Sequence, residues 1–175
     1  MSGGADEAVL QGARTRTISW EDPAVVAAAS RSRSGLEVMR AIAAGELPPP
    51  PFAATLGVDL VGVESGRAVF ELVPGEFHYN PLGVVHGGIA MTMLDSAMGC
   101  AVQSTLEAGQ AYTTLQVNVH FVRPLSVATG VVRAEGLAVH VGRKLATAEG
   151  RATALETGKL LAHATTTCLV IGEDG

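Results

Sequence analysis

The spacing of apolar residues predicts six strands in this chain. The segments with short apolar runs and bounding turn residues are 58–63, 67–73, 113–122, 131–141, 144–155 and 160–171. In the third of these, Leu115, Val117, Val119 and Phe121 alternate with polar residues, which is the period of two expected of a strand. Because short turns join the strands, we expect a mostly antiparallel sheet.

A nearly apolar segment separates the second predicted strand from the third. It runs from about Gly87 to Thr105, and Asp95 is its only charged residue. A helix that is apolar almost all round must be covered by other parts of the protein. Two strands, one long helix and four strands therefore predict an α+β fold, in which a curved sheet wraps around one central helix.

The N-terminal part of the chain has a different pattern. Residues 1–34 are rich in Ala, Ser, Gly and Arg, and we predict a flexible tail. Residues 35–44 have the amphipathic spacing of a short helix, and the four prolines at 48–51 predict an extended polyproline segment. We therefore divide the chain into a tail (1–34), a short helix with a polyproline strut (35–51) and one folded domain (52–172).

Composition narrows the class of protein. The chain has 175 residues, of which 47% are hydrophobic and 17% are charged, and this suits one packed domain. The net charge of -5 gives no general basic surface, so we predict no nucleic-acid partner. The first residues do not resemble a secretory signal, and Asp95 and several glycines interrupt the longest apolar stretch. We expect a cytoplasmic protein that does not insert into a membrane.

Several kinds of reactive site are not indicated. Cys100 and Cys168 form no C-x-x-C pair, and we expect buried reduced thiols. The spacing of the histidines does not match that of metal ligands, so we predict no metal. The chain also contains no G-x-S-x-G motif of the kind that carries the nucleophile in many serine hydrolases.

The predicted helix carries two features that can support chemistry. Asp95 is a lone carboxylate on an apolar helix, and burying an unpaired charge is costly. The alternative is an aspartate satisfied by internal hydrogen bonds. Gly87 and Gly88 begin the helix, where free N–H groups can polarise a carbonyl oxygen and stabilise an oxyanion. The alternative there is a tight corner between strand and helix that binds no ligand.

The distance between these features predicts a second subunit. Gly87 and Asp95 are eight residues apart, which separates their backbones by about 12 Å along a straight helix. A reacting carbonyl must lie about 3 Å from both the oxyanion donor and the attacking group. Two antiparallel helices related by a two-fold axis satisfy this requirement. We therefore expect a homodimer with two composite sites.

The segment that contains these residues also resembles a known family. Asn80-Pro-Leu-Gly-Val-Val-His-Gly-Gly88, separated by six residues from Asp95, is similar to the hotdog-fold acyl-CoA thioesterases of the PaaI-like branch of the 4-hydroxybenzoyl-CoA thioesterase superfamily. The segments Thr114–Leu125 and Val141-Gly-Arg-Lys144 look like later parts of the same family. The resemblance covers about residues 35–172 and implies the hotdog fold.

The resemblance implies a role for each residue of the motif. Asp95 is the expected general base or nucleophile, and the N–H of Gly87 polarises the thioester carbonyl. Asn80 helps to hold the attacking water or the carboxylate, and His86 shapes the loop. Thr114 falls near the water. The family's paired sites lie at a dimer interface, and many members form tetramers, so dimer and tetramer both stay open.

Other residues are expected to bind the substrate. Gly88 lies where a ligand approaches the backbone. Arg143 and Lys144 are candidates for contacts with coenzyme A phosphates, and Arg123 is a weaker one; the alternative for each is a solvated charge. An apolar acyl pocket is expected from Met91, Met98, Phe77 and Leu82.

The predicted function is hydrolysis of an acyl- or aroyl-CoA thioester to the free acid and coenzyme A. No cofactor is expected, because coenzyme A is part of the substrate. Two alternatives stay open: a non-catalytic hotdog protein that binds or senses acyl-CoA, and a hotdog acyl-CoA dehydratase or hydratase. The pattern does not specify the acyl group, nor does it decide between a general base and a nucleophile.

Overall fold

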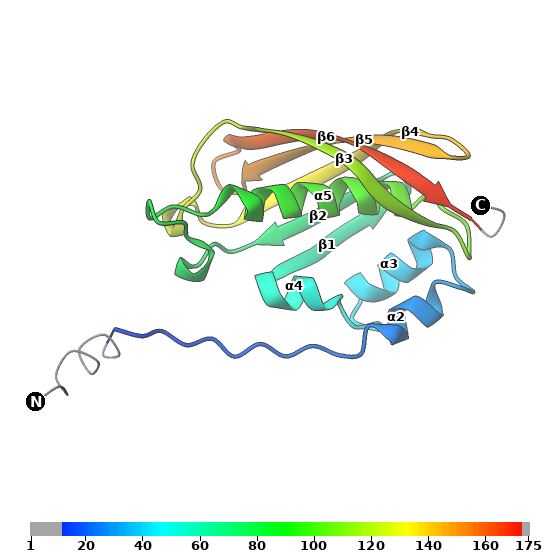
Figure 1. The fold of residues 1–175 in the computed structure, drawn as a ribbon, viewed down its shortest axis with the longest axis horizontal. Coiled ribbons are helices and arrows are strands. Elements are labelled where there is room, and N and C mark those ends of the chain that lie inside the picture. The colour runs from blue at the N-terminus through cyan, green and yellow to red at the C-terminus, as the bar shows by residue number, and fades with distance from the viewer. Residues whose placement is uncertain (1–11, 173–175) are drawn as a thin grey trace, which may run out of the picture.

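One long helix and six strands form the body of the molecule (Figure 1). The computed structural model describes residues 12–172. Its helices are α2 (Ala24–Ala29), α3 (Gly35–Ala43), α4 (Pro51–Leu56) and α5 (Gly87–Gln103), with short 3-10 turns η1 (Glu76–His78) and η2 (Val127–Thr129). Its strands are β1 (Val58–Glu64), β2 (Arg67–Leu72), β3 (Ala111–Phe121), β4 (Val132–Val141), β5 (Leu145–Ala154) and β6 (Leu160–Ile171).

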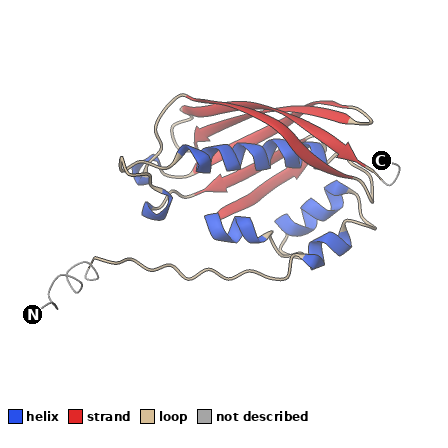
Figure 2. Cartoon of the chain, viewed as in Figure 1, coloured by secondary structure: helices blue, strands red, loops and turns tan. Residues whose placement is uncertain are grey.

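The strands form one sheet in the order β1-β2-β4-β5-β6-β3, and every neighbouring pair is antiparallel. The chain leaves the β1–β2 hairpin, passes through α5 and returns at the far edge of the sheet as β3. Figure 2 shows α5 enclosed between the β1–β2 end and the β3–β6 end. The predicted α+β fold, with an antiparallel sheet wrapped around one central helix, is confirmed.

The sequence of α5 explains its central position. The residues that it buries are apolar or small and lie on most of its circumference: Ala90, Met93, Leu94, Ala97, Met98, Gly99, Ala101 and Val102. Each large apolar side chain that is fully buried contributes about 1.5–3 kcal/mol to folding. The strands contact the helix through small residues. At Gly136 on β4, an added Cβ would lie 2.3 Å from the carbonyl oxygen of Ala97. A side chain at that position would push the helix away.

Strand β3 is an edge strand with an interrupted alternation. Its register against β6 shifts between Thr114 and Gln116, so that Leu115 has no partner and forms a bulge. Leu115 is consequently 57% exposed. The predicted alternation of apolar residues through the strand is therefore wrong at Leu115. The strand follows the predicted range of 113–122 to within two residues.

The polyproline strut is shorter than predicted, and a helix follows it. Pro50 has the extended angles φ -64° and ψ 148°. Pro51 is the first residue of α4, where a proline is tolerated because the first N–H of a helix has no internal partner. The sequence interpretation missed α4. Met39 of α3 is 3% exposed and belongs to the same core as α5, so residues 35–51 pack as part of the folded body.

Part of the predicted tail contacts this body. A guanidinium nitrogen of Arg16 donates to the carbonyl oxygen of Thr55 at 2.6 Å, and its carbon lies 4.0 Å from the centroid of the Phe77 ring. Arg14 forms an ion pair with Glu76 at 2.6 Å. Residues 12–22 have no helix or strand and α2 follows them, whereas residues 1–11 lie outside the described range. The flexibility of residues 1–34 stays a prediction.

The contact between Gly136 and α5 gives a test of the helix packing. We expect Gly136→Ala to lower the free energy of unfolding by about 1–3 kcal/mol, because the new methyl group overpacks the interface. Denaturant unfolding measures this change. Gly62→Ala is the control: its Cβ would lie 3.8 Å from Val69, an ordinary contact. Equal stability of the two variants would contradict the packing described here.

Candidate active site

His86 and the two glycines after it form the N-terminus of α5. His86 is the N-cap residue, and its Nδ1 accepts a hydrogen bond from the N–H of Gly88 at 2.9 Å. Nδ1 therefore carries no proton in this arrangement, and Nε2 can donate. Within residues 12–172 no acceptor lies within hydrogen-bond distance of the Gly87 N–H. One of the two predicted ligand-facing N–H groups, that of Gly88, is thus occupied by the cap.

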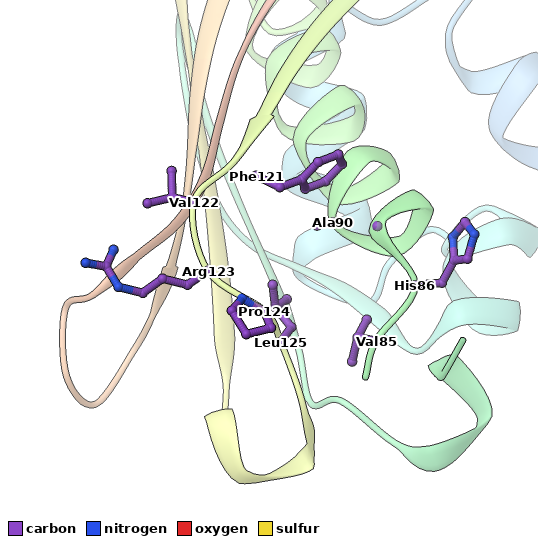
Figure 3. Close-up of a pocket in the computed structure, with 9 residues that line it drawn as sticks. Val85, His86, Ala90, Phe121, Val122, Arg123, Pro124 and Leu125 are labelled. Atoms are coloured by element: carbon purple, nitrogen blue, oxygen red, sulfur yellow. The ribbon is translucent and has the colours of Figure 1, made fainter. Parts of the chain in front are cut away.

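A pocket of about 250 Å³ lies at this end of the helix (Figure 3). It is lined by the start of α5 with the two residues before it, and by the last residue of β3 with the segment after it: Val85, His86, Gly87, Ala90, Phe121, Val122, Arg123, Pro124 and Leu125. The Phe121 ring lies so close to the helix that a Cβ on Gly87 would be 3.2 Å from it. The pocket thus places an apolar ring beside a free backbone donor.

Asn80 folds the loop that precedes the helix. Its side-chain oxygen accepts from the N–H of Leu82 at 2.9 Å, and its backbone N–H donates to the carbonyl of Val84 at 2.8 Å. Gly83, with φ +76°, allows the loop to turn. These bonds assign Asn80 a structural role in its own loop. Its predicted contact with a water or with the carboxylate stays a prediction.

Asp95 is half-buried in the middle of α5 and faces β3. The Thr114 hydroxyl donates to its Oδ1 at 2.9 Å. This is the internal hydrogen bond that the sequence left open as an alternative, but it uses one carboxylate oxygen and fixes the direction of the other. The pocket at Gly87 does not include Asp95. The fold therefore brings Asp95 and Thr114 together and keeps both of them away from Gly87 in the same chain.

The neighbourhood of Asp95 also contains Tyr112 and Cys100. The Tyr112 hydroxyl lies over the helix at Gly99, where an added Cβ would be 2.1 Å away. Burial, followed by the charge of Asp95, raises the pKa of Cys100 to about 12. Burial likewise raises the pKa of Tyr112. Both groups are neutral near pH 7, and Cys100 is not a thiolate nucleophile.

The predicted acyl-pocket residues have different environments. Met91 is 44% exposed on the open side of α5, and Leu82 is 86% exposed in the Asn80 loop. Met98 is fully buried and packs against the sheet at Gly150. Met98 does not line the pocket at Gly87, and its predicted place in an acyl pocket stays a prediction. A helix that is apolar all round gives no sequence signal for which apolar face is the core face.

The three basic residues that were predicted to bind coenzyme A phosphates lie at different ends of α5. Arg143 and Lys144 are exposed in the β4–β5 turn. That turn lies near the C-terminal end of α5, since Ala138 of β4 bonds to Gly66, whose own N–H donates to Ser104. Arg123 lines the Gly87 pocket, but its guanidinium donates to the Leu160 carbonyl at 2.6 Å and extends away from His86 in Figure 3.

Sequence comparison identifies the family. A sequence model described as "Thioesterase superfamily" matches residues 82–161. The 1,4-dihydroxy-2-naphthoyl-CoA hydrolase of Listeria monocytogenes is 31% identical over 107 residues, which cover 61% of this chain and 85% of that protein. The chain belongs to the thioesterase superfamily. Acyl-coenzyme A thioesterase 13 of Mus musculus is 30% identical over 109 residues, covering 61% of this chain and 74% of the mouse protein.

Structural comparison agrees with this membership. A phenylacetic acid degradation-related protein from Ralstonia eutropha JMP134 superposes with a TM-score of 0.67 at 33% identity, and the match covers 75% of this chain and 98% of that one. The resemblance to PaaI-like hotdog thioesterases is confirmed, and this member of the superfamily is a thioester hydrolase.

In residues 12–172, no helix is long and apolar enough to cross a bilayer, and no group of three metal-ligating side chains is present.

The sequence interpretation treated His78 as a loop residue next to Asn80 and as a candidate for the mouth of the pocket, whereas the structure buries it. It is 3% exposed, and its Nε2 lies 2.8 Å from the Leu56 carbonyl oxygen at the end of α4. Its Nδ1 accepts from the N–H of Gly75 at 3.1 Å, and its own carbonyl accepts from the N–H of His86 at 2.8 Å. His78 thereby joins α4 to the loop that begins α5. A histidine in a loop gives no sequence signal of such burial.

Burial lowers the pKa of His78 below its usual value of 6.5. The unfolded chain therefore takes up this proton at a higher pH than the folded chain does. The stability due to neutral His78 is complete above pH 6.5 and is lost as the pH falls below that value. We expect the melting temperature of His78→Gln to fall less steeply than that of the wild type as the pH is lowered from about 7.5 to about 5. His140→Gln, at an exposed site, is the control and should keep the wild-type slope.

Proposed function

We propose that this thioester hydrolase acts on acyl-CoA, with Asp95 as its general base and the N–H of Gly87 as its oxyanion donor. The observation that carries the proposal is the pair formed by Asp95 and Thr114, at 2.9 Å, on a helix that also presents a free N–H at its first residue. The names of the Listeria and mouse relatives, a naphthoyl-CoA hydrolase and an acyl-coenzyme A thioesterase, support the class of substrate.

The proposed reaction is a hydrolysis with one activated water. Oδ2 of Asp95 accepts a proton from the water as its oxygen bonds to the thioester carbon. The carbonyl oxygen becomes an oxyanion and accepts a hydrogen bond from the Gly87 N–H, strengthened by the positive end of the α5 dipole. The C–S bond then breaks, and the proton held by Asp95 passes to the sulfur. The products are the free acid and coenzyme A. Thr114 is a positioning residue in this scheme.

The distance along α5 requires a second subunit in the proposed site. Gly87 and Asp95 are separated by about 12 Å of helix, so one carbonyl cannot contact both in one chain. Two copies with antiparallel α5 helices bring Gly87 of one subunit to Asp95 of the other. The exposed edge β3 and the exposed Met91 and Leu115 support contact on this side. We therefore propose a homodimer as the active unit.

The same arrangement suggests where coenzyme A binds. In an antiparallel pair that places Gly87 of one subunit opposite Asp95 of the other, the C-terminal end of each α5 extends eight residues, or about 12 Å, past the helix start of the partner subunit. Arg143 and Lys144, at that end, would then lie beyond the partner's pocket, in the direction in which the phosphate-bearing part of coenzyme A can extend away from the thioester. We propose that they bind phosphates. Arg123 is less suited to this role, because its guanidinium already donates to the Leu160 carbonyl.

Substitution of Asp95 tests the proposed reaction. We expect Asp95→Asn to lower kcat by at least about a thousandfold, because the amide cannot accept the proton from water. The Asn side chain still accepts the bond from Thr114, so the melting temperature should stay close to that of the wild type. Thiol release from a panel of acyl-CoA thioesters measures kcat. Near-normal hydrolysis by a folded Asp95→Asn protein would refute the role of Asp95, and Thr114→Val should cause a smaller loss than Asp95→Asn.

A further inference from the structure

A second cavity lies between the N-terminal helices and the β1 edge of the sheet. Its volume is about 590 Å³, within the range of about 300–1,000 Å³ that small-molecule sites occupy. Its walls come from α3, the polyproline segment, α4 and β1, which lie side by side in Figure 1. Apart from Cys100, its lining residues fall outside residues 82–161, the part of the chain that matches the family.

The chemistry of the walls selects an apolar, uncharged occupant. Met39, Ile42, Leu60 and Phe70 line the cavity together with three prolines. The charged residues that line it are all acidic: Glu21, Glu46 and Asp59. These carboxylates repel phosphates and carboxylates, so they exclude the nucleotide of coenzyme A and a free acid that enters head first. A neutral hydrocarbon chain fits these walls.

The position of the cavity connects it to Asp95. Cys100 lines the cavity and lies five residues after Asp95, about 7.5 Å further along α5. The negative charge of Asp95 contributes to the raised pKa of the Cys100 thiol, so the two side chains lie within electrostatic range. Ser96 is half-buried between them, next to Asp95 in sequence and one turn before Cys100. Five residues of helix also turn the direction of the side chain by about 140°, so an acyl chain that leaves the reacting carbonyl would pass Ser96 and turn around α5 to reach the cavity.

We propose that this cavity holds the aliphatic acyl chain of the substrate and makes the enzyme selective for medium-chain acyl-CoA. The proposal rests on the proposed function. A benzoyl group, with its ring attached directly to the carbonyl, ends before the cavity and gains nothing from it. An acetyl group is likewise too short. Each CH₂ group that is buried in the cavity adds to the discrimination between chain lengths.

Three substitutions separate the cavity from the chemistry. Ile42 is half-buried in the cavity wall, so Ile42→Trp narrows the space and Ile42→Ala widens it. Val25, on α2, is 46% exposed and does not line the cavity, which makes Val25→Trp the matched control. The readouts are kcat/KM for butyryl-, decanoyl- and benzoyl-CoA.

In the wild type we expect kcat/KM for decanoyl-CoA to exceed that for butyryl-CoA at least about tenfold. Ile42→Trp should lower the decanoyl value at least about tenfold and change the butyryl value less than about twofold. Ile42→Ala should move the preference towards longer chains, and Val25→Trp should change neither value. Equal losses on both substrates, or a preference for benzoyl-CoA that Ile42→Trp leaves unchanged, would overturn the cavity assignment and leave the proposed function standing.

Binding tests the cavity independently of turnover. In Asp95→Asn, calorimetry should give tighter binding of decanoyl-CoA than of butyryl-CoA, and the added Ile42→Trp should abolish the difference. If the wild type releases no thiol from any acyl-CoA, the proposed function is wrong, whereas this binding comparison still decides the cavity. Equal affinity for the two chains would overturn the cavity assignment.

Discussion

A straight α-helix fixes the separation of any two of its residues, and in α5 it holds Gly87 about 12 Å from Asp95. Gly136 of β4 lies close against the backbone of Ala97, so the sheet contacts the helix directly between these two residues and its C-terminal end. The donor and the carboxylate of one chain therefore serve different sites. This constraint makes a second copy of the chain part of the proposed chemistry.

Strand β3 runs antiparallel to α5 and contacts it at successive levels. Phe121 lies at the first turn, Thr114 at Asp95 and Tyr112 at Gly99. The bulge at Leu115 shifts the alternation of side chains between the two faces of the strand by one residue. Thr114, before the bulge, and Phe121, after it, therefore both face the helix. An edge strand without the bulge would turn one of them outwards. The irregular part of β3 thus lies beside the candidate site.

The pattern of apolar residues was sufficient to predict the strands, the antiparallel sheet and the central helix. The lone charge of Asp95 and the Gly87-Gly88 pair also indicated the candidate site in the sequence. The bulge at Leu115 could not be predicted, because an unpaired residue has no compositional signal. The burial of Met98 was missed, since an apolar helix does not reveal its core face. The 590 Å³ cavity depends on how α3 and α4 pack against β1, which local pattern does not encode.

The most direct measurement of the composite site uses mixed dimers of two inactive variants. Gly87→Pro removes the N–H donor and adds side-chain atoms beside the Phe121 ring. The backbone accepts the change, because proline is favoured at the first position of a helix and His86, at φ -60° and ψ 134°, accepts a following proline. Gly87→Ala keeps the donor and is its control.

Subunits of Gly87→Pro and Asp95→Asn, unfolded and refolded together in equal amounts, form hybrid dimers in which one of the two sites has both an intact Gly87 and an intact Asp95. The account predicts recovery of about a quarter of wild-type thiol release. No recovery, from hybrids shown to have formed, would mean that each chain carries its own complete site and would contradict the account.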